Sequence, residues 1–317
     1  MDPAAPSGTS QTPTTPATAR TRAEVEAHIH ARLLAGRNAD GGWPYRPGKR
    51  SRIEATCWAL LALGDQATSG ATTLRNWPRS DQLLVDVPST PVNYAFNALA
   101  AFTLLADPAT QREAEPIVRR IVAVKGKTFA GRSDAVKQNN QIEAWSWIEG
   151  TACWVEPTAW CLLLLKKRRE AGTSADADAR IATGEALLFD RMCRNGGWNY
   201  GNPNVYGKDL WPYVPTTALA LMALQDRADH PGVQKSLIEL RSDVRSERSV
   251  LALALSVICT RLFEGRSLEL EAQLIAQYVS AGPLAEDDLL ATAMMAVALS
   301  DARAAVFALK PREASRA

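Results

Sequence analysis

One short pattern occurs three times in this chain: an aromatic triplet that begins with Trp, a loop rich in glycine and proline, and a Thr that opens an apolar segment ending in Leu. The first Trp and the Thr of the three copies are Trp43 and Thr56, Trp145 and Thr158, and Trp198 and Thr217. A helical hairpin built on such a copy cannot bury its own apolar face, so several hairpins must stack side by side to form a common core. The repeat therefore decides the architecture.

Apolar periodicity and chain breakers predict about twelve helices in pairs, each pair an outer helix followed by an inner one. The predicted ranges are 22–35 with 53–64, 79–85 with 92–105, 111–124 with 157–169, 177–194 with 216–226, 231–244 with 248–263, and 268–279 with 287–302. The inner members are apolar on nearly all sides, which is typical of helices enclosed by neighbours. An open solenoid would leave one of their faces in water. We therefore predict an all-α fold, a closed α/α toroid of about six helical hairpins.

The chain divides into three parts on composition. Residues 1–21 are rich in Pro and Thr and indicate a disordered tail, residues 22–302 hold the predicted toroid, and residues 303–317 form a C-terminal end with a polar tail. The tail has no apolar core like that of a secretory signal. No apolar stretch reaches the roughly 18 residues that span a bilayer.

Charge and cysteine content narrow the function classes. The 317 residues carry a formal net charge of +2, which argues against a dedicated nucleic-acid surface. The five cysteines show no spacing typical of a disulfide framework, so we expect free thiols and a cytoplasmic protein. With only three histidines, we expect no metal site and no cofactor.

The turns and helix starts resemble a known repeat. The turn segments are 38–43 (Asn-Ala-Asp-Gly-Gly-Trp) and 195–198 (Asn-Gly-Gly-Trp), and the helix starts are 53–56 (Ile-Glu-Ala-Thr) and 155–158 (Val-Glu-Pro-Thr). They resemble the repeat shared by squalene and oxidosqualene cyclases and by protein prenyltransferase β subunits. Over about residues 22–302 the resemblance implies the α6/α6 barrel of that superfamily, and it is more specific for fold than for function.

The chain lacks the chemical motifs of both groups. The resemblance to class II cyclases would imply an Asp-x-Asp-Asp acid motif, and the nearest segment, 285–288, has Ala in place of the first Asp. Asp287 and Asp288 remain candidates, although acidic residues at a helix start are more simply read as caps. The Asp, Cys and His zinc ligands of the prenyltransferases have no counterpart.

Glu54 and Glu156 are the candidate catalytic carboxylates. Each lies two residues before the repeat Thr, at the start of an inner helix, and Pro215 takes this place in the third copy. Burial near aromatic rings would raise the pKa of such a carboxyl towards that of a general acid. Glu156 is favoured because Trp154 and Trp160 flank it. The structural alternative is that both residues satisfy the first turn of a helix.

Aromatic and amide side chains are the candidate substrate-binding groups. Trp145, Trp147, Trp154 and Trp160 could stabilise a carbocation, Tyr45, Tyr200 and Trp211 lie on predicted rim loops, and Asn93 and Asn97 share one helix face.

Three functions follow from these candidates. The first is a terpenoid-cyclase-like protein that binds a polyprenyl or triterpenoid chain in a central apolar cavity, with Glu156 as acid. The second is a non-catalytic toroid that binds a lipid or a partner protein. The third is a carbohydrate-active toroid with paired carboxylates at Glu149 and Glu156. A partner chain or peripheral membrane association is compatible with the first two.

Overall fold

The computed structural model describes residues 21–67, 70–129, 135–172 and 174–310, so most of the two predicted terminal tails lies outside the described residues. The inner helices are α2 (Ile53–Leu63), α4 (Tyr94–Ala106), α6 (Val155–Arg169), α8 (Val214–Ala223), α10 (Val250–Glu264) and α13 (Leu289–Leu299). The outer helices are α1 (Arg22–Ala35), α3 (Gly70–Arg75), α5 (Gln111–Ala123), α7 (Ala175–Asp190), α9 (Pro231–Asp243) and α11 (Leu268–Ala281). Shorter elements are α12 (Pro283–Glu286), α14 (Asp301–Ala304), and the strands β1 (Arg79–Ser80), β2 (Leu83–Leu84), β3 (Asn204–Val205) and β4 (Lys208–Asp209).

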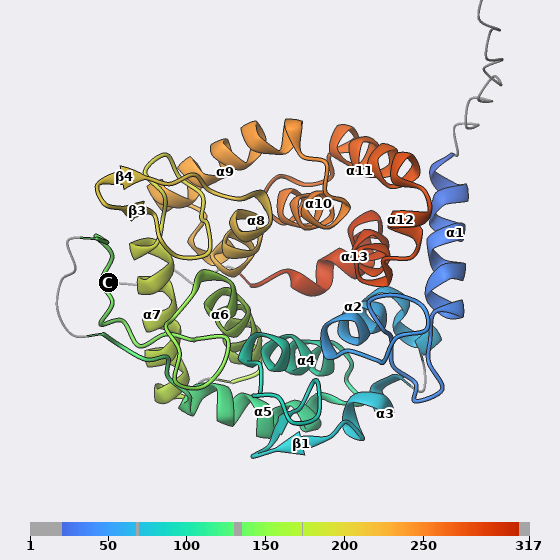
Figure 1. Ribbon diagram of the computed structural model, residues 1–317, viewed down its shortest axis with the longest axis horizontal. Coiled ribbons are helices and arrows are strands. Elements are labelled where there is room, and N and C mark those ends of the chain that lie inside the picture. The colour runs from blue at the N-terminus through green and yellow to red at the C-terminus, as the bar shows by residue number, and fades with distance from the viewer. Residues whose placement is uncertain (1–20, 68–69, 130–134, 173, 311–317) are drawn as a thin grey trace, which may run out of the picture.

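The six inner helices form a closed ring with the outer helices around it (Figure 1). Each inner helix packs on the next in chain order, and α13 packs on α2, which closes the ring. The predicted closed α/α toroid is therefore confirmed. Within the described residues no single helix is long and apolar enough to cross a membrane, although α13 and the bent segment 301–307 pass that test together.

The repeated Trp and Thr hold each turn against its two helices. The hydroxyl oxygen of Thr56 accepts a hydrogen bond from the backbone N–H of Trp43 at 2.9 Å, and Thr217 does the same for Trp198. Each Trp ring in turn donates its indole N–H to a carbonyl near the end of the preceding outer helix, as Trp43 does to Leu33 at 2.7 Å. Because both groups are buried, these bonds satisfy polar atoms that water cannot reach.

A fourth copy of the turn is present without its Trp or its Thr. The side chain of Asn97 accepts from the backbone N–H of Leu84 at 2.7 Å and donates to the Leu84 carbonyl at 3.0 Å. The separation is thirteen residues, as in the first two copies. Asn97 therefore performs the structural task of the repeat Thr, which the sequence pattern did not reveal.

The predicted helix over residues 79–85 is wrong. This segment forms the antiparallel pair β1 and β2, and the outer helix of the second pair is α3 instead. Asp81 and Gln82 between the strands have φ values of 45° and 69°, a left-handed conformation that cannot continue an α-helix.

Three of the turns also cap the inner helix of the preceding repeat through a backbone hydrogen bond. The backbone N–H of Val155 donates to the carbonyl of Tyr200, and that of Tyr94 donates to Trp147. Where the last repeat meets the first, the backbone N–H of Leu289 donates to the carbonyl of Tyr45 at 2.9 Å. The last inner helix is thus capped by the first turn, and the ring closes by the same contact that joins two pairs of its interior repeats.

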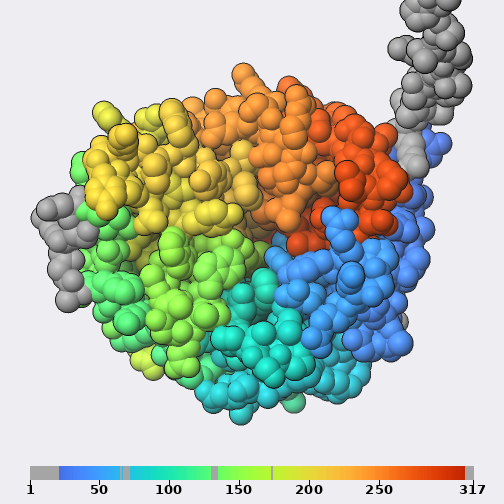
Figure 2. Space-filling view, viewed as in Figure 1, coloured from blue at the N-terminus to red at the C-terminus, as the bar shows by residue number. Residues whose placement is uncertain are grey.

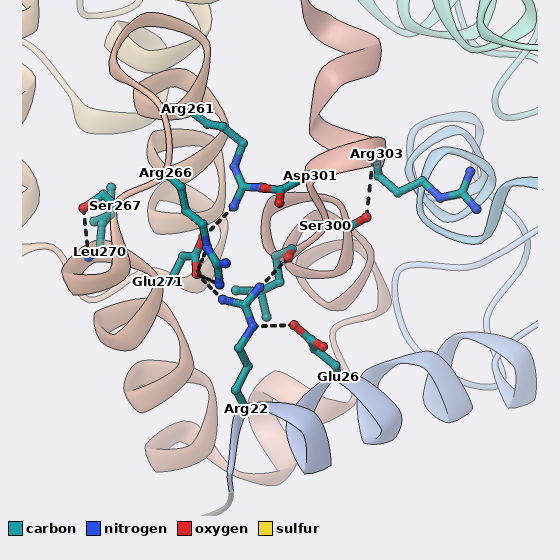
Figure 3. A network of polar contacts seen from close by, with 11 residues as sticks. Arg22, Glu26, Arg261, Arg266, Ser267, Leu270, Glu271, Ser300, Asp301 and Arg303 are labelled. Carbon is teal, nitrogen blue, oxygen red and sulfur yellow. Dashed lines mark hydrogen bonds and ion pairs between the residues drawn. The ribbon is translucent and has the colours of Figure 1, made fainter.

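A buried carboxylate reinforces this closure (Figure 3). Glu271 on α11 is 1% exposed and accepts hydrogen bonds from three guanidinium groups, those of Arg22, Arg261 and Arg266. Arg22 on α1 also donates to the carbonyl of Leu299 at the end of α13. One carboxylate therefore ties the first outer helix to the last repeat.

The C-terminal segment closes one end of the ring. Residues 305–307 form a 3-10 turn, and the fully buried Phe307 stacks on Trp58 and Phe102 with ring centroids 5.4 and 5.0 Å apart. Trp160 packs on the same ring at 6.5 Å. Gln225 fixes the segment by binding the carbonyl of Phe307 and the N–H of Leu309. At this end, aromatic side chains fill the centre of the ring.

The turn contacts can be tested at Thr217. In Thr217→Val the shape is kept but the buried N–H of Trp198 loses its acceptor, so we expect the free energy of unfolding to fall by about 1–3 kcal/mol. Urea unfolding of Thr217→Val measures this loss. Thr183→Val is the control, because the Thr183 hydroxyl lies near the surface of α7 and binds only a carbonyl one turn earlier. Equal losses in the two variants would contradict this role of the repeat Thr.

Candidate functional site

The candidate site lies at the end of the ring where the inner helices begin. Glu54 and Glu156 are the second residues of α2 and α6, so both carboxylates lie at the mouth of the barrel. Figure 2 shows the face on which the connecting loops gather, hollowed near the middle of the ring. Both side chains are only partly buried, and both are close enough to the other inner helix starts to interact electrostatically.

Glu54 has partners that compensate its charge. The hydroxyl of Tyr45 donates a hydrogen bond to Glu54 Oε2 at 2.7 Å. Arg52, which stacks over the Tyr45 ring at 4.7 Å, is paired with Asp86. Burial raises the pKa of Glu54, whereas the Tyr45 hydrogen bond and the Arg52 charge oppose that rise.

Glu156 has no such compensation. Within the described ranges its side chain makes no hydrogen bond and no ion pair. Burial, and then the nearby charge of Glu54, raise the pKa of Glu156 from 4.5 to about 8. Glu156 is therefore mostly protonated at neutral pH.

The two carboxyl groups act as a pair with unequal proton affinity. The charge of Glu54 raises the pKa of Glu156, whereas the rise in the pKa of Glu54 is opposed by a hydrogen-bond donor and a nearby cation, so Glu156 is the member of the pair that keeps a proton more readily. Carboxyl pairs whose environments separate their pKa values in this way are suited to acid–base chemistry, one as proton donor and the other as carboxylate.

An aromatic groove adjoins this pair at the same mouth. Its volume is about 660 Å³, and it lies between the start of α8 and the segment 243–248. Its lining includes the exposed rings of Trp211, Tyr200 and Tyr213, which are 73%, 52% and 49% exposed. The carbonyl of Tyr200 accepts from the backbone N–H of Val155, the residue before Glu156, so the groove lies beside the start of α6 although neither carboxyl lines it. Asp243, Glu247 and Arg248 supply polar groups along it.

Several predicted binding residues serve the structure instead. Trp145 is fully buried and donates its indole N–H to Ile121 at 2.8 Å, so it cannot line a cavity. Trp160 belongs to the Phe307 stack. Asn97 holds the fourth turn, and Asn93 caps α4 by accepting from Phe96. Trp145, Asn93 and Asn97 thus use side-chain polar atoms for hydrogen bonds to the backbone.

The remaining candidate acids have other partners or are exposed, although the charge of Asp288 lies close enough to raise the pKa of Glu54. Asp287 is exposed and paired with Arg32, and Asp288 caps α13 by accepting from the N–H of Ala291 at 3.0 Å. Glu149 is exposed, so the carboxyl that the structure places near Glu156 is Glu54 and not Glu149.

Trp147 and Trp154 are half-buried near the mouth.

Among the described residues no group of three or more His, Cys, Asp or Glu side chains could hold a metal ion. All five cysteines are free and buried.

The mouth also contains residues that sequence reasoning missed. Asp86 follows Leu84 by two residues, as Tyr45 follows Trp43, so the two residues have equivalent places in their turns. The Asp86 carboxylate accepts a hydrogen bond from the backbone N–H of Ile53 at the start of α2. The offset from the turn could have identified it, but only once Leu84 is known to replace the Trp.

The raised pKa of Glu156 predicts a pH-dependent cost to stability. Because the folded state favours the protonated carboxyl, the free energy of unfolding should fall as pH rises from 4.5 to about 8. Glu156→Gln removes this cost, so at pH 8 the variant should be more stable than the wild type by about 2–4 kcal/mol. Near pH 4 the two should be equal. Urea unfolding across this range measures the difference, with the exposed Glu149→Gln as control, and a gap that does not change with pH would contradict the assignment.

Comparison with known proteins supports the fold. No protein-family model and none of the curated proteins matches the chain. An α-amylase from Clostridium perfringens is similar with a TM-score of 0.59 and 8% identity, covering 86% of this chain and 96% of that one. An inactive variant of an α-1,6-mannanase from Salegentibacter, in complex with α-1,6-mannotriose, has a TM-score of 0.56 and 9% identity, covering 87% and 99%.

The type II terpene cyclase MstE from Scytonema also matches, with a TM-score of 0.49 and 16% identity, covering 81% of this chain and 78% of that one. At such identities these likenesses show the fold alone. The α/α toroid fold expected from the sequence is supported, and the cyclase identity is not. Fold and site together define an α/α toroid with a carboxyl pair at its mouth.

Proposed function

We propose that this protein is a carbohydrate-active enzyme that hydrolyses glycosidic bonds at the mouth of the toroid. The observation that carries the proposal is the carboxyl pair: Glu156 protonated and without a partner, and Glu54 held by Tyr45. Most glycoside hydrolases use two carboxyl groups in this division, one as acid and one as base or nucleophile. The similar α-amylase and α-1,6-mannanase act on carbohydrates, which agrees with this choice.

In the proposed reaction Glu156 donates its proton to the glycosidic oxygen as the bond to the anomeric carbon breaks. The carboxylate of Glu54 removes a proton from the water whose oxygen bonds to that carbon. One water is consumed, and the proton balance is restored when Glu54 returns its proton through solvent to Glu156. The Tyr45 hydroxyl keeps its proton, because burial and the Glu54 charge raise the pKa of Tyr45, and so it orients Glu54 as a donor.

The aromatic groove supplies the substrate surface. Sugar rings present C–H faces that pack on exposed aromatic rings, and the groove offers those of Tyr200, Trp211 and Tyr213 beside polar groups. Its volume and its open shape suit a chain of sugar units rather than an enclosed small molecule.

The cyclase hypothesis fits the interior less well. A polyprenyl or triterpenoid chain would need a deep apolar cavity, whereas the centre of the ring at its far end is filled by Phe307, Trp58 and Phe102. A raised pKa at Glu156 would also suit protonation of an alkene, so squalene belongs among the substrates tested.

The experiment is a turnover screen of the purified chain against α- and β-linked glucans, mannans and xylans, with squalene as a further substrate. We expect release of reducing ends from a polysaccharide. Cyclised squalene would replace the proposal with the cyclase, and no turnover of any substrate, with or without bound lipid or protein, would favour a non-catalytic toroid.

A further inference from the structure

A second pocket lies at the opposite end of the ring from the carboxyl pair. It has a volume of about 440 Å³ and is formed where α2 and α4 end, beside α3 and the C-terminal segment. Its apolar lining includes the side chains of Leu60, Leu61, Leu74, Leu104 and Val306. Pockets of this volume with an apolar wall and few polar groups are typical of small-molecule sites.

Arg303 is the cation of this pocket, and most of its donors are unused. A guanidinium has five N–H donors. That of Arg303 makes one hydrogen bond, from Nη2 to the carbonyl of Leu63 at 3.1 Å, and has no carboxylate partner among the described residues. Figure 3 shows its guanidinium pointing away from the Glu271 cluster, so the neighbouring acids do not neutralise it.

The other polar groups of the pocket are occupied or lie apart. The hydroxyls of Thr103 and Thr110 donate to the carbonyls of Leu99 and Leu104 at 2.9 and 2.8 Å. Asp107 also lines the pocket, but it is exposed, accepts from the N–H of Ala109 and forms no ion pair with Arg303. The pocket therefore offers one unpaired cation at the edge of an apolar wall.

We propose that this pocket binds a small monocarboxylate with an apolar body, such as a medium-chain fatty acid. The carboxylate would accept hydrogen bonds from the free N–H groups of Arg303, and the hydrocarbon would lie against the leucines of α2 and α4. Arginine suits this contact because its planar fork matches the two oxygens of a carboxylate. This site is independent of the carboxyl pair at the mouth, so its existence does not rest on the proposed hydrolysis.

Calorimetric titration of the full chain with sodium octanoate tests the proposal, with 1-octanol and inorganic phosphate as comparison ligands. We expect saturable binding of octanoate that is roughly 10- to 100-fold weaker in Arg303→Gln and unchanged in Arg112→Gln, a control at an exposed arginine of α5. Asp107→Asn should strengthen binding, since it removes a negative charge from the same pocket.

Three results would overturn the proposal. They are an equal affinity for octanol, which would mean that the cation plays no part; an equal affinity for phosphate, which would mean a simple anion site; and the absence of saturable binding to the wild type. If Arg303→Gln does not fold, octanoate-induced shifts of the Leu60 and Leu104 methyl resonances in the wild-type protein decide the question. Shifts confined to the mouth of the ring would contradict it.

Discussion

Glu156→Gln is expected to lower the rate of glycoside hydrolysis by roughly 100- to 10,000-fold, the usual contribution of a general acid. The amide has the size of the carboxyl but cannot give up a proton to the leaving oxygen. Because the proposed substrate surface is the aromatic groove, KM should change little and the loss should appear in kcat. Steady-state kinetics on the polysaccharide that the screen identifies measure both quantities.

The leaving group separates this role from a structural one. A dinitrophenyl glycoside has a leaving group that departs without protonation, so Glu156→Gln should lose far less activity on it. Glu54→Gln should lose activity on both substrates, since the water still needs a base. Glu149→Gln is the matched control at an exposed carboxyl and should behave as the wild type. Equal losses on both substrates for Glu156→Gln would contradict the acid assignment.

Glu271→Ala is expected to reduce the free energy of unfolding by about 3–5 kcal/mol, since it leaves the charges of Arg22, Arg261 and Arg266 without their shared carboxylate. Burial alone would raise the pKa of Glu271, but the hydrogen bonds from Arg266 and Arg22 outweigh it and lower that pKa. The stabilisation should therefore be complete above pH 4.5 and be lost as pH falls through the lowered pKa.

Urea unfolding at pH 7 measures the loss, and Glu264→Ala is the control. Glu264 pairs with Arg241 at the surface, where such a pair contributes about 0–1 kcal/mol. A loss in Glu271→Ala no larger than that of the control would mean that the closure does not depend on this carboxylate.

The ring itself could be predicted from the sequence because its signal is repeated. The inner helices are apolar on all sides, and the helix starts and turns recur, so the predicted ranges of eleven of the twelve helices agree with the structure to within a few residues. The outer helix of the second pair was placed wrongly because Leu84 and Asn97 replace the Trp and Thr that mark the other turns, whereas its inner helix was predicted correctly as α4. The Asn97 amide keeps the hydrogen bond to the turn that Thr makes elsewhere, but a search for Trp and Thr does not find it.

The candidate site could be predicted only in part. The position of Glu54 and Glu156 before the repeat Thr placed both at one mouth, since equivalent positions of a closed ring face the same end. The burial of Trp145 follows from its repeat position, because the indoles of Trp43 and Trp198 are buried in the same way. Trp154 lies outside that position, and its exposure depends on which loops cover it, so it could not be predicted. The filling of the far end by Phe307 depends on a C-terminal segment with no repeat signal.

The central claim is that the mouth of the ring keeps one carboxyl protonated at neutral pH. It is tested most directly by a carbon-13 NMR titration of the glutamate side-chain carboxyls, in which comparison with Glu156→Gln assigns the resonance. The account predicts a midpoint at about pH 8 for Glu156, which should fall in Glu54→Gln as the neighbouring charge is removed. A midpoint near 4.5 would contradict it, because an ordinary carboxyl at that position is ionised at neutral pH and cannot serve as the acid.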